Sequence, residues 1–205
     1  MRVRNIQNAS EQLNNFDRYL NNTNNMDNIE LEIGMGKGEF LINKAITNPD
    51  KIFIGVELNI SVLCLAMKKI LKYEKDNNTY ISNIYITSFD AITISEKFKE
   101  NSINNIYLNF SDPWPKYKHR KRRLTYKTYI DEYLKVLKND FKIYFKTDNR
   151  GLFESSIKSI NNYPLIIEEI YLDLHKEKID NIMTEYEKKF CLNGPIYMLV
   201  AKKSK

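Results

Sequence analysis

Short apolar segments alternate along the chain with segments whose apolar residues recur at helical spacing. The short segments predict strands at residues 29–33, 52–56, 84–88, 105–110, 141–146, 165–173 and 196–201. Helices are predicted at 12–20, 39–46, 61–70, 92–98, 125–137, 152–160 and 184–190, the third of them capped by Ser61. Strands that alternate with helices through short connections are typical of βαβ units. We therefore expect an α/β fold, with a mostly parallel sheet and helices on both faces.

Acidic residues recur where the predicted strands end. Glu57, Asp90, Asp112 and Asp148 each follow a strand closely, and Glu32 lies inside the first strand. Ligands of open α/β sheets bind at the carboxyl ends of the strands. These side chains are therefore expected to line one cleft.

The first strand leads into a glycine-rich loop that contains Gly34, Gly36 and Gly38. Such a loop is either a tight turn or a place where a ligand approaches the backbone closely. Its spacing differs from the G-x-G-x-x-G loop that binds a pyrophosphate. Glu57 stands where a carboxylate accepts hydrogen bonds from both ribose hydroxyls, and Asp90 is placed to accept from an adenine amino group. Together they favour an adenosine ligand without phosphate, which suggests S-adenosylmethionine.

The chain of 205 residues carries a net charge of +6, from 32 basic and 26 acidic side chains. This favours an anionic partner, although charge alone does not separate tRNA from DNA, a ribosome or a membrane surface. No apolar run approaches the roughly 20 residues that span a bilayer. The N-terminus also lacks the apolar core of a secretory signal. Two distant cysteines, Cys64 and Cys191, favour a reducing cytoplasm over a disulfide framework.

Residues 109–123 combine a carboxylate, an aromatic ring and a dense run of basic side chains. Asp112 precedes Pro113 and Trp114 precedes Pro115, and a residue before proline is pushed towards extended conformations. We therefore expect a stiff, non-helical segment after the strand. The basic side chains that follow are Lys116, Lys118, His119, Arg120, Lys121, Arg122 and Arg123. The combination indicates chemistry on a polyanion.

At these residues the chain resembles the bacterial tRNA (guanine-N7-)-methyltransferase family. The similar segments are LEIGMGKGEF, IGVELN, YLNFSDPWPKYKHRKRRL, FKTDNRGLFE and NIMTEYEKKF. The resemblance implies a class I methyltransferase (Rossmann-like) domain at 29–205, preceded by a polar extension at 1–28. It also implies S-adenosylmethionine as cofactor and methyl transfer to N7 of the variable-loop guanine of tRNA (position 46 in tRNA numbering). The expected enzyme is cytoplasmic, has no membrane contact, and is a monomer or a homodimer.

The resemblance also assigns roles to single residues, with Asp112 as the catalytic one. From the glycine loop and the resemblance together, the expected cofactor contacts are Glu32, Gly34, Gly36, Glu57, Asp90 and Asp112. The expected substrate contacts are Lys116, Asp148, Thr184, Glu185, Tyr186 and Glu187. The expected RNA contacts are Lys118, His119, Arg120, Lys121, Arg122 and Arg123. Before residue 29 only Arg2 and Arg4 align, and no RNA contact is assigned there.

Guanine N7 carries a free lone pair and no proton, so methyl transfer to it needs no general base. We expect Asp112 to orient the base and to stabilise the positive charge that develops on it, without shuttling a proton. The alternative for Asp112 is a turn-capping aspartate. Trp114 either stacks on the target base or packs beneath the loop. His119 and His175 lack neighbours at metal-ligand spacing, so no metal site is expected.

Several assignments have structural alternatives. Glu32 either meets a cationic part of the ligand or forms an ion pair within the fold. Asp148 either faces the substrate or caps the following helix. Thr184 and Glu187 fit a capping box as well as a substrate contact.

Three other functions compete with this interpretation. N6-adenine methylation uses an acidic or amide residue with Pro-Pro-aromatic after the fourth strand, where this chain has Asp-Pro-Trp-Pro. A nicotinamide-linked oxidoreductase is disfavoured by the glycine spacing. A non-catalytic RNA-binding protein is disfavoured because Glu57, Asp90 and Asp112 are all present.

Overall fold

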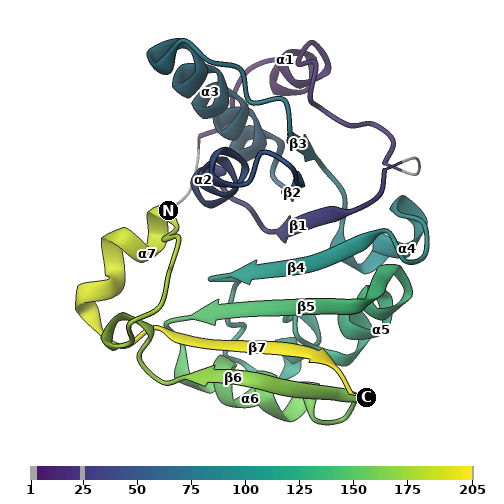
Figure 1. Cartoon of the computed structure of the whole chain (residues 1–205), viewed down its shortest axis with the longest axis vertical. Coiled ribbons are helices and arrows are strands. Elements are labelled where there is room, and N and C mark those ends of the chain that lie inside the picture. Colours follow the sequence, from purple (N-terminus) through teal and green to yellow (C-terminus); the bar gives the residue numbers. More distant parts are fainter. Residues whose placement is uncertain (1–3, 24–25, 205) are drawn as a thin grey trace.

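Residues 4–23 and 26–204, which the computed structural model describes, form a seven-stranded sheet flanked by helices (Figure 1). The strands follow the order β3-β2-β1-β4-β5-β7-β6. They are β1 (Ile29–Ile33), β2 (Ile52–Val56), β3 (Ile84–Thr87), β4 (Ile103–Asn109), β5 (Leu137–Thr147), β6 (Leu165–Tyr171) and β7 (Tyr197–Lys203). The first five run parallel, whereas β7 lies antiparallel between β5 and β6. The predicted α/β fold with a mostly parallel sheet is confirmed.

The α-helices lie on both faces of the sheet and beyond its carboxyl edge. They are α1 (Ala9–Asn14), α2 (Glu39–Thr47), α3 (Ile60–Asn77), α4 (Ile94–Lys97), α5 (Lys127–Val136), α6 (Arg150–Ile160) and α7 (Glu185–Phe190). Short 3-10 helices add η1 (Ala91–Thr93), η2 (Tyr117–Arg122), η3 (Leu174–Lys176) and η4 (Cys191–Asn193). Figure 1 shows α7 beyond the ends of β4 and β5. In the described part of the chain, no helix is both long enough and apolar enough to cross a bilayer.

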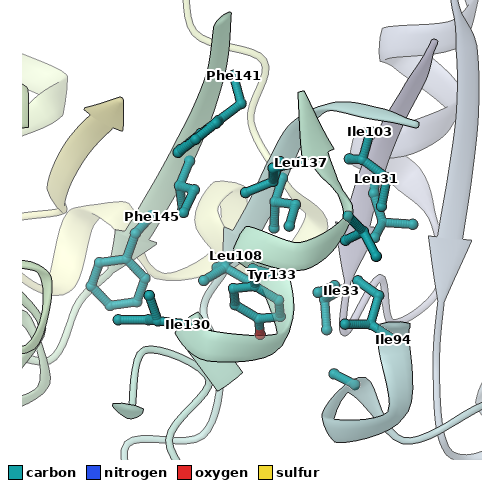
Figure 2. Close-up of a cluster of buried hydrophobic side chains, with 14 of the residues drawn as sticks. Leu31, Ile33, Ile94, Ile103, Leu108, Ile130, Tyr133, Leu137, Phe141 and Phe145 are labelled. Carbon is teal, nitrogen blue, oxygen red and sulfur yellow. The ribbon is translucent and has the colours of Figure 1, made fainter. Parts of the chain in front are cut away.

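Two hydrophobic cores attach the helices to the sheet. On one face, α1, α2 and α3 share a core with Phe53 of β2 and Ile84 of β3. On the other face, α4, α5 and α6 pack against the central strands. Figure 2 shows Leu31 and Leu108 there, together with Tyr133 of α5. Each buried leucine contributes about 1.5–3 kcal/mol, and burial on both faces explains the continuous apolar runs of the strands.

The N-terminal segment is packed onto the sheet and α3. Its helix is α1 (Ala9–Asn14), which overlaps the helix predicted at 12–20 only at residues 12–14, so the prediction is wrong for residues 15–20. Beyond α1 the buried Arg18 donates to the Glu74 carboxylate (Nη2–Oε2 2.9 Å), and Tyr19 forms a β-bridge with Ile86. These partners lie far away in the sequence, and their contacts override the local helical tendency. Residues 1–3, with Arg2, and residues 24–25 of the predicted extension lie outside the described residues.

The helix α3 begins slightly earlier than the sequence suggested. Asn59 is its N-cap, because Asn59 Oδ1 accepts hydrogen bonds from the amides of Ser61 (3.0 Å) and Val62 (3.2 Å). Ser61, the predicted cap, instead lies in the first turn and accepts from the Ile6 amide (3.0 Å). Asparagine and serine cap helices about equally well, so the tertiary contact decides between them.

Candidate active site

Two adjoining cavities lie at the carboxyl ends of the parallel strands. The first cavity measures about 500 Å³ and the second about 430 Å³, and both are lined by Gly34 and Phe110. Glu57, Asp90 and Asp112 line the first cavity together. The parallel sheet thus brings three of the predicted carboxylates to one place.

The glycine loop is held to the end of β2 by Glu57. One carboxylate oxygen of Glu57 accepts from the Gly36 amide (3.2 Å) and the other from the Asn59 amide (3.0 Å). Gly34 and Gly36 have φ angles of 75° and 55°, and a Cβ at either position would meet no atom within 4 Å. The space above these glycines is therefore open to a ligand, and the left-handed backbone favours glycine there.

Beyond Glu57, apolar side chains form the walls of the first cavity. Leu58 is 62% exposed although it lines the cavity. Leu124 and Tyr129 also contribute to this lining. Asp90 Oδ1 accepts from the Ile92 amide (3.2 Å), which places this carboxylate at the start of η1. A slot with apolar walls and a carboxylate at its rim suits a flat heterocycle with an amino group.

Glu32 lines the second cavity. It forms no ion pair with any described residue, so the alternative of an ion pair within the fold is not met. Its Oε1 accepts from Asn109 Nδ2 (2.9 Å). Glu32 Oε2 and Asn109 Oδ1 are buried, and neither has a hydrogen-bond partner among the described residues. Burial raises the pKa of Glu32 to about 8, although Asn109 and Lys146 act in the opposite direction. Two buried acceptors without a donor fit a ligand that carries a cationic amine.

Because the pKa of Glu32 is raised, the free energy of unfolding should depend on pH. The variant Glu32→Gln should lose this dependence. In the unfolded chain the carboxyl has its ordinary pKa near 4.5, so between pH 4.5 and 8 the folded protein binds the extra proton. Stability of the ligand-free protein should therefore fall as pH rises through this window, by a few kcal/mol in total, about 1.4 per unit at most. Urea unfolding from pH 5 to 9 measures it. Parallel pH profiles for wild type and Glu32→Gln would contradict the prediction.

Asp112 is exposed in a loop without regular structure that follows β4, as predicted. Two aromatic residues with left-handed backbones flank it, Phe110 with φ 52° and Trp114 with φ 41°. Side chains other than glycine adopt such angles at an energetic cost, which the surrounding structure must offset. The expectation of an extended backbone before Pro115 is therefore wrong at Trp114.

The loop conformation is explained by Arg123, which donates to backbone oxygens inside it. Its guanidinium reaches Pro113 O (3.0 Å) and Trp114 O (3.1 Å), and also Ser155 Oγ (2.8 Å). The Arg122 guanidinium lies over the Trp114 ring at 4.8 Å. These contacts fix Trp114 in its left-handed conformation and pack its ring beneath basic side chains.

The members of the basic run 116–123 differ in their contacts within the protein. Lys116, Lys118 and Lys121 are exposed, whereas the Arg120 guanidinium lies over the Tyr117 ring at 3.8 Å. Three further members pack against the loop or the cavity: His119, which meets the Trp114 ring edge-on, Arg122, which also lines the first cavity, and Arg123. The RNA contacts predicted for these residues remain predictions, and the exposed lysines are the freest to make them.

Of the two alternatives for residues 184–187, the start of α7 shows the capping box, and substrate contact stays a prediction. Thr184 and Glu187 form a capping box, in which Thr184 Oγ1 accepts from the Glu187 amide (2.9 Å). Glu187 is fully buried and pairs with the buried Lys146 (2.8 Å). Thr184, Glu185 and Tyr186 line the second cavity, but Glu187 does not. Glu187 therefore holds α7 in place from inside.

The outer side of α7 is tied to the glycine loop and to α3. Glu185 pairs with Lys69 (2.8 Å) and Lys37 (2.9 Å), and hydrogen bonds from these two lysines lower the pKa of Glu185 to about 2. The Tyr186 hydroxyl donates to Asp148 (2.8 Å), and its ring centroid lies 5.0 Å from that of Phe110. Asp148 itself does not line the second cavity, but its carboxylate holds Tyr186, which does. The alternative of helix capping is not met, because Asn149 caps α6.

Comparison with known proteins gives a consistent result. The family described as "Putative methyltransferase" matches residues 26–199. A tRNA (guanine-N(7)-)-methyltransferase of Streptococcus suis is 39% identical over 209 aligned residues, covering 96% of this chain and 96% of that protein. The protein of that name from Bacillus velezensis is 47% identical over 171 residues, covering 82% of this chain and 76% of the relative. The chain belongs to the tRNA (guanine-N(7)-)-methyltransferase family.

A solved structure supports the fold of this tRNA (guanine-N(7)-)-methyltransferase family member. An antibiotic-related methyltransferase superposes with a TM-score of 0.62 at 17% identity, over 98% of this chain and 94% of the other. At that identity the likeness concerns the fold alone. The resemblance inferred from the sequence is confirmed by the more similar relatives, and the class I methyltransferase fold by the structure.

Sequence reasoning missed several residues that line the cavities of this tRNA (guanine-N(7)-)-methyltransferase family member. Leu58 follows Glu57, and Asn109 and Phe110 lie just before Asp112. Their closeness in sequence to these predicted site residues could have indicated that they line the cavities. Tyr129 and Phe190 come from helices and have no local signal. Among the described residues, no group of three or more His, Cys, Asp or Glu side chains is arranged to hold a metal.

Proposed function

We propose that this chain transfers a methyl group from S-adenosylmethionine to N7 of a guanine in tRNA, and that the target is the variable-loop guanine at position 46. The observation that carries the proposal is the position of Asp112. It lines the same cavity as Glu57 and Asp90, and the basic η2 segment follows it directly. A cofactor site, a catalytic carboxylate and a polyanion-binding surface are thereby contiguous. The enzyme would act in the cytoplasm, as a monomer or a homodimer.

The described residues fit S-adenosylmethionine, which supplies an electrophilic methyl group on a sulfonium when bound. Glu57 is placed to accept from the ribose hydroxyls, and Asp90 from the adenine amino group. Gly34 and Gly36 leave open space along the loop. Glu32 supplies a buried acceptor at the edge of the second cavity.

Catalysis requires alignment more than proton transfer. Since guanine N7 has a lone pair and no proton, fixing the base in line with the methyl group can supply up to about 7–11 kcal/mol. Asp112 accepts from the guanine N1 and N2 donors and stabilises the charge that develops on the purine. Tyr186, which lines the second cavity, would hold the nucleotide together with Asp148 and Lys116. Glu187, inside the fold, would act by placing α7.

The exposed lysines of η2 predict a measurable salt dependence of tRNA binding. Replacing both Lys118 and Lys121 by glutamine should leave up to two tRNA phosphates without a cationic partner. The slope of log affinity against log salt concentration would then flatten by about one unit for each such phosphate. Filter binding of tRNA from 50 to 300 mM salt measures the slope, a range chosen because about a tenfold change or more is expected across it.

The matched control replaces Lys158 and Lys203 by glutamine. Both are exposed, and they lie at the opposite end of the sheet, near the end of α6 and in β7. The control removes the same net charge and should leave the slope almost unchanged. Equal slopes for the two double variants would show that only total charge matters and would contradict an η2 contact.

The proposed reaction is tested by incubating the purified chain with labelled S-adenosylmethionine and tRNA that lacks modifications. Digestion to nucleosides should yield labelled 7-methylguanosine, and a transcript with adenine at position 46 should accept no label. 6-Methyladenosine would replace the proposal by N6-adenine methylation. Binding of tRNA without transfer of label would leave the chain as an RNA-binding protein.

A further inference from the structure

The loop that carries Asp112 has few supports of its own. Residues 111–115 form no backbone–backbone hydrogen bond with any residue that the structure describes, and two of the five are prolines, which have no N–H. Among the described residues, the side-chain hydrogen bonds to this loop all come from Arg123, which donates to Pro113 O (3.0 Å) and Trp114 O (3.1 Å). The placement of the catalytic carboxylate therefore depends on one guanidinium.

The same guanidinium also reaches a second element of the site. Arg123 Nη1 donates to Ser155 Oγ (2.8 Å), and Ser155 belongs to α6. This helix is capped by Asn149, directly after Asp148. Arg123 thus links the loop of Asp112 to the helix that follows the other carboxylate predicted to meet the nucleotide.

The ring of Trp114 is held by other members of the basic run. Arg122 lies over it at 4.8 Å, and His119 meets it edge-on at 5.8 Å. Both contacts tie the ring to η2, the segment that follows the loop. The bond from Arg123 to Trp114 O instead holds the backbone, at a residue whose φ of 41° is unfavourable without such support.

We propose that Arg123 is a positioning residue for methyl transfer, which holds the Asp112 loop against α6 and does not bind a tRNA phosphate. This role rests on the proposed function, because Asp112 is the group that is positioned. A guanidinium has five N–H donors in a rigid fork, and hydrogen bonds within the protein occupy three of them. Its side chain is half-buried, whereas Lys118 and Lys121 in the same run are exposed.

Arg123→Lys separates the two roles, because it keeps the positive charge and loses the fork. We expect the single-turnover rate of methyl transfer at saturating tRNA to fall by about 10–100-fold, the effect of a small misplacement of a reacting group. The salt dependence of tRNA affinity should stay as in wild type. A phosphate contact predicts the reverse, a rate close to wild type, since lysine also binds phosphate.

Fluorescence follows the loop without turnover, because Trp114 is the only tryptophan of the chain. In Arg123→Lys the emission of Trp114 should shift to the red and be quenched more strongly by acrylamide. Lys121→Gln should leave the emission and the quenching unchanged, and should instead flatten the slope of log tRNA affinity against log salt by about one unit.

A second variant guards against a general effect on folding. Ser155→Ala keeps Arg123 and removes only the link to α6, so the rate should fall by less than in Arg123→Lys, with the thermal midpoint near that of wild type. The matched control is Lys158→Gln, an exposed residue of the same helix. It should change neither the rate nor the quenching.

Three results discriminate between the possibilities. Wild-type rates and quenching in both Arg123→Lys and Ser155→Ala would show that Arg123 does not hold the loop. A salt slope that flattens in Arg123→Gln as much as in Lys121→Gln would make Arg123 a phosphate contact and overturn the positioning role. Absence of methyl transfer by the wild-type chain would overturn the proposed function, and the quenching of Trp114 would still decide whether Arg123 holds the loop.

Discussion

Asp112→Asn is expected to lower the rate of methyl transfer by about 10²–10³-fold, the usual effect of removing one group that stabilises transition-state charge. The substitution keeps the shape of the side chain and removes its charge. Since Asp112 is exposed in a loop, folding does not depend on it. The thermal midpoint and the affinity for S-adenosylhomocysteine should stay close to wild type. Single-turnover transfer of label to tRNA measures the rate.

The control for this variant is Asp140→Asn, an exposed aspartate of β5 at the opposite end of the sheet. It should transfer methyl groups at the wild-type rate. If Asp112→Asn also stays within threefold of wild type, Asp112 does not stabilise the developing charge. The catalytic role would then have to be sought elsewhere in the cavity.

Lys146→Met is expected to destabilise the protein by about 3–5 kcal/mol, because it removes the buried ammonium partner of Glu187 and leaves this carboxylate with the His175 ring and the Asn181 amide. Lys146 is 4% exposed and Glu187 is 0% exposed. In a chain of this size the loss corresponds to a fall of about 10 °C in the thermal midpoint. Urea unfolding measures the free energy. Methyl transfer should also fall, since α7 loses its internal anchor.

The double variant Lys146→Met with Glu187→Leu distinguishes loss of the ion pair from loss of packing. Removing both charges should recover much of the stability, because an apolar replacement of a buried pair is often neutral. Lys188→Met is the matched control, since Lys188 forms an exposed ion pair with Glu39 (2.7 Å) and should change stability by at most about 0.5 kcal/mol. A loss below about 1 kcal/mol for Lys146→Met would mean that water reaches Glu187.

The sequence predicts well those features that depend on neighbours along the chain. The strands at 29–33 and 52–56 are found where expected, because buried parallel strands need continuous apolar runs. Glu57, Asp90 and Asp112 meet in one cavity because parallel strands present their carboxyl ends at the same edge. The first turn of α7 could likewise be predicted, because Thr184 and Glu187 have the spacing of a capping box.

Features that depend on distant partners could not be predicted. Arg123 belongs to a basic run, and only the folded loop shows that it donates to Pro113 O and Trp114 O. Lys146 and Glu187 are separated by 41 positions, and neither has a local signal for burial. The strand predicted at 141–146 in fact begins at Leu137. The prediction missed its first four residues because Lys138, Asn139 and Asp140 are polar and interrupt the apolar pattern.

The order of the last strands has a consequence for how the protein is made. β7 inserts between β5 and β6 although it follows β6 in the sequence. During synthesis, β6 therefore leaves the ribosome before the strand with which it pairs exists. The backbone of β6 stays unpaired until β7 has been translated. Two of its apolar side chains, Ile166 and Ile170, are exposed even in the finished protein. Folding of this half of the sheet can be completed only after that point, and the nascent chain is most open to wrong pairing in the interval.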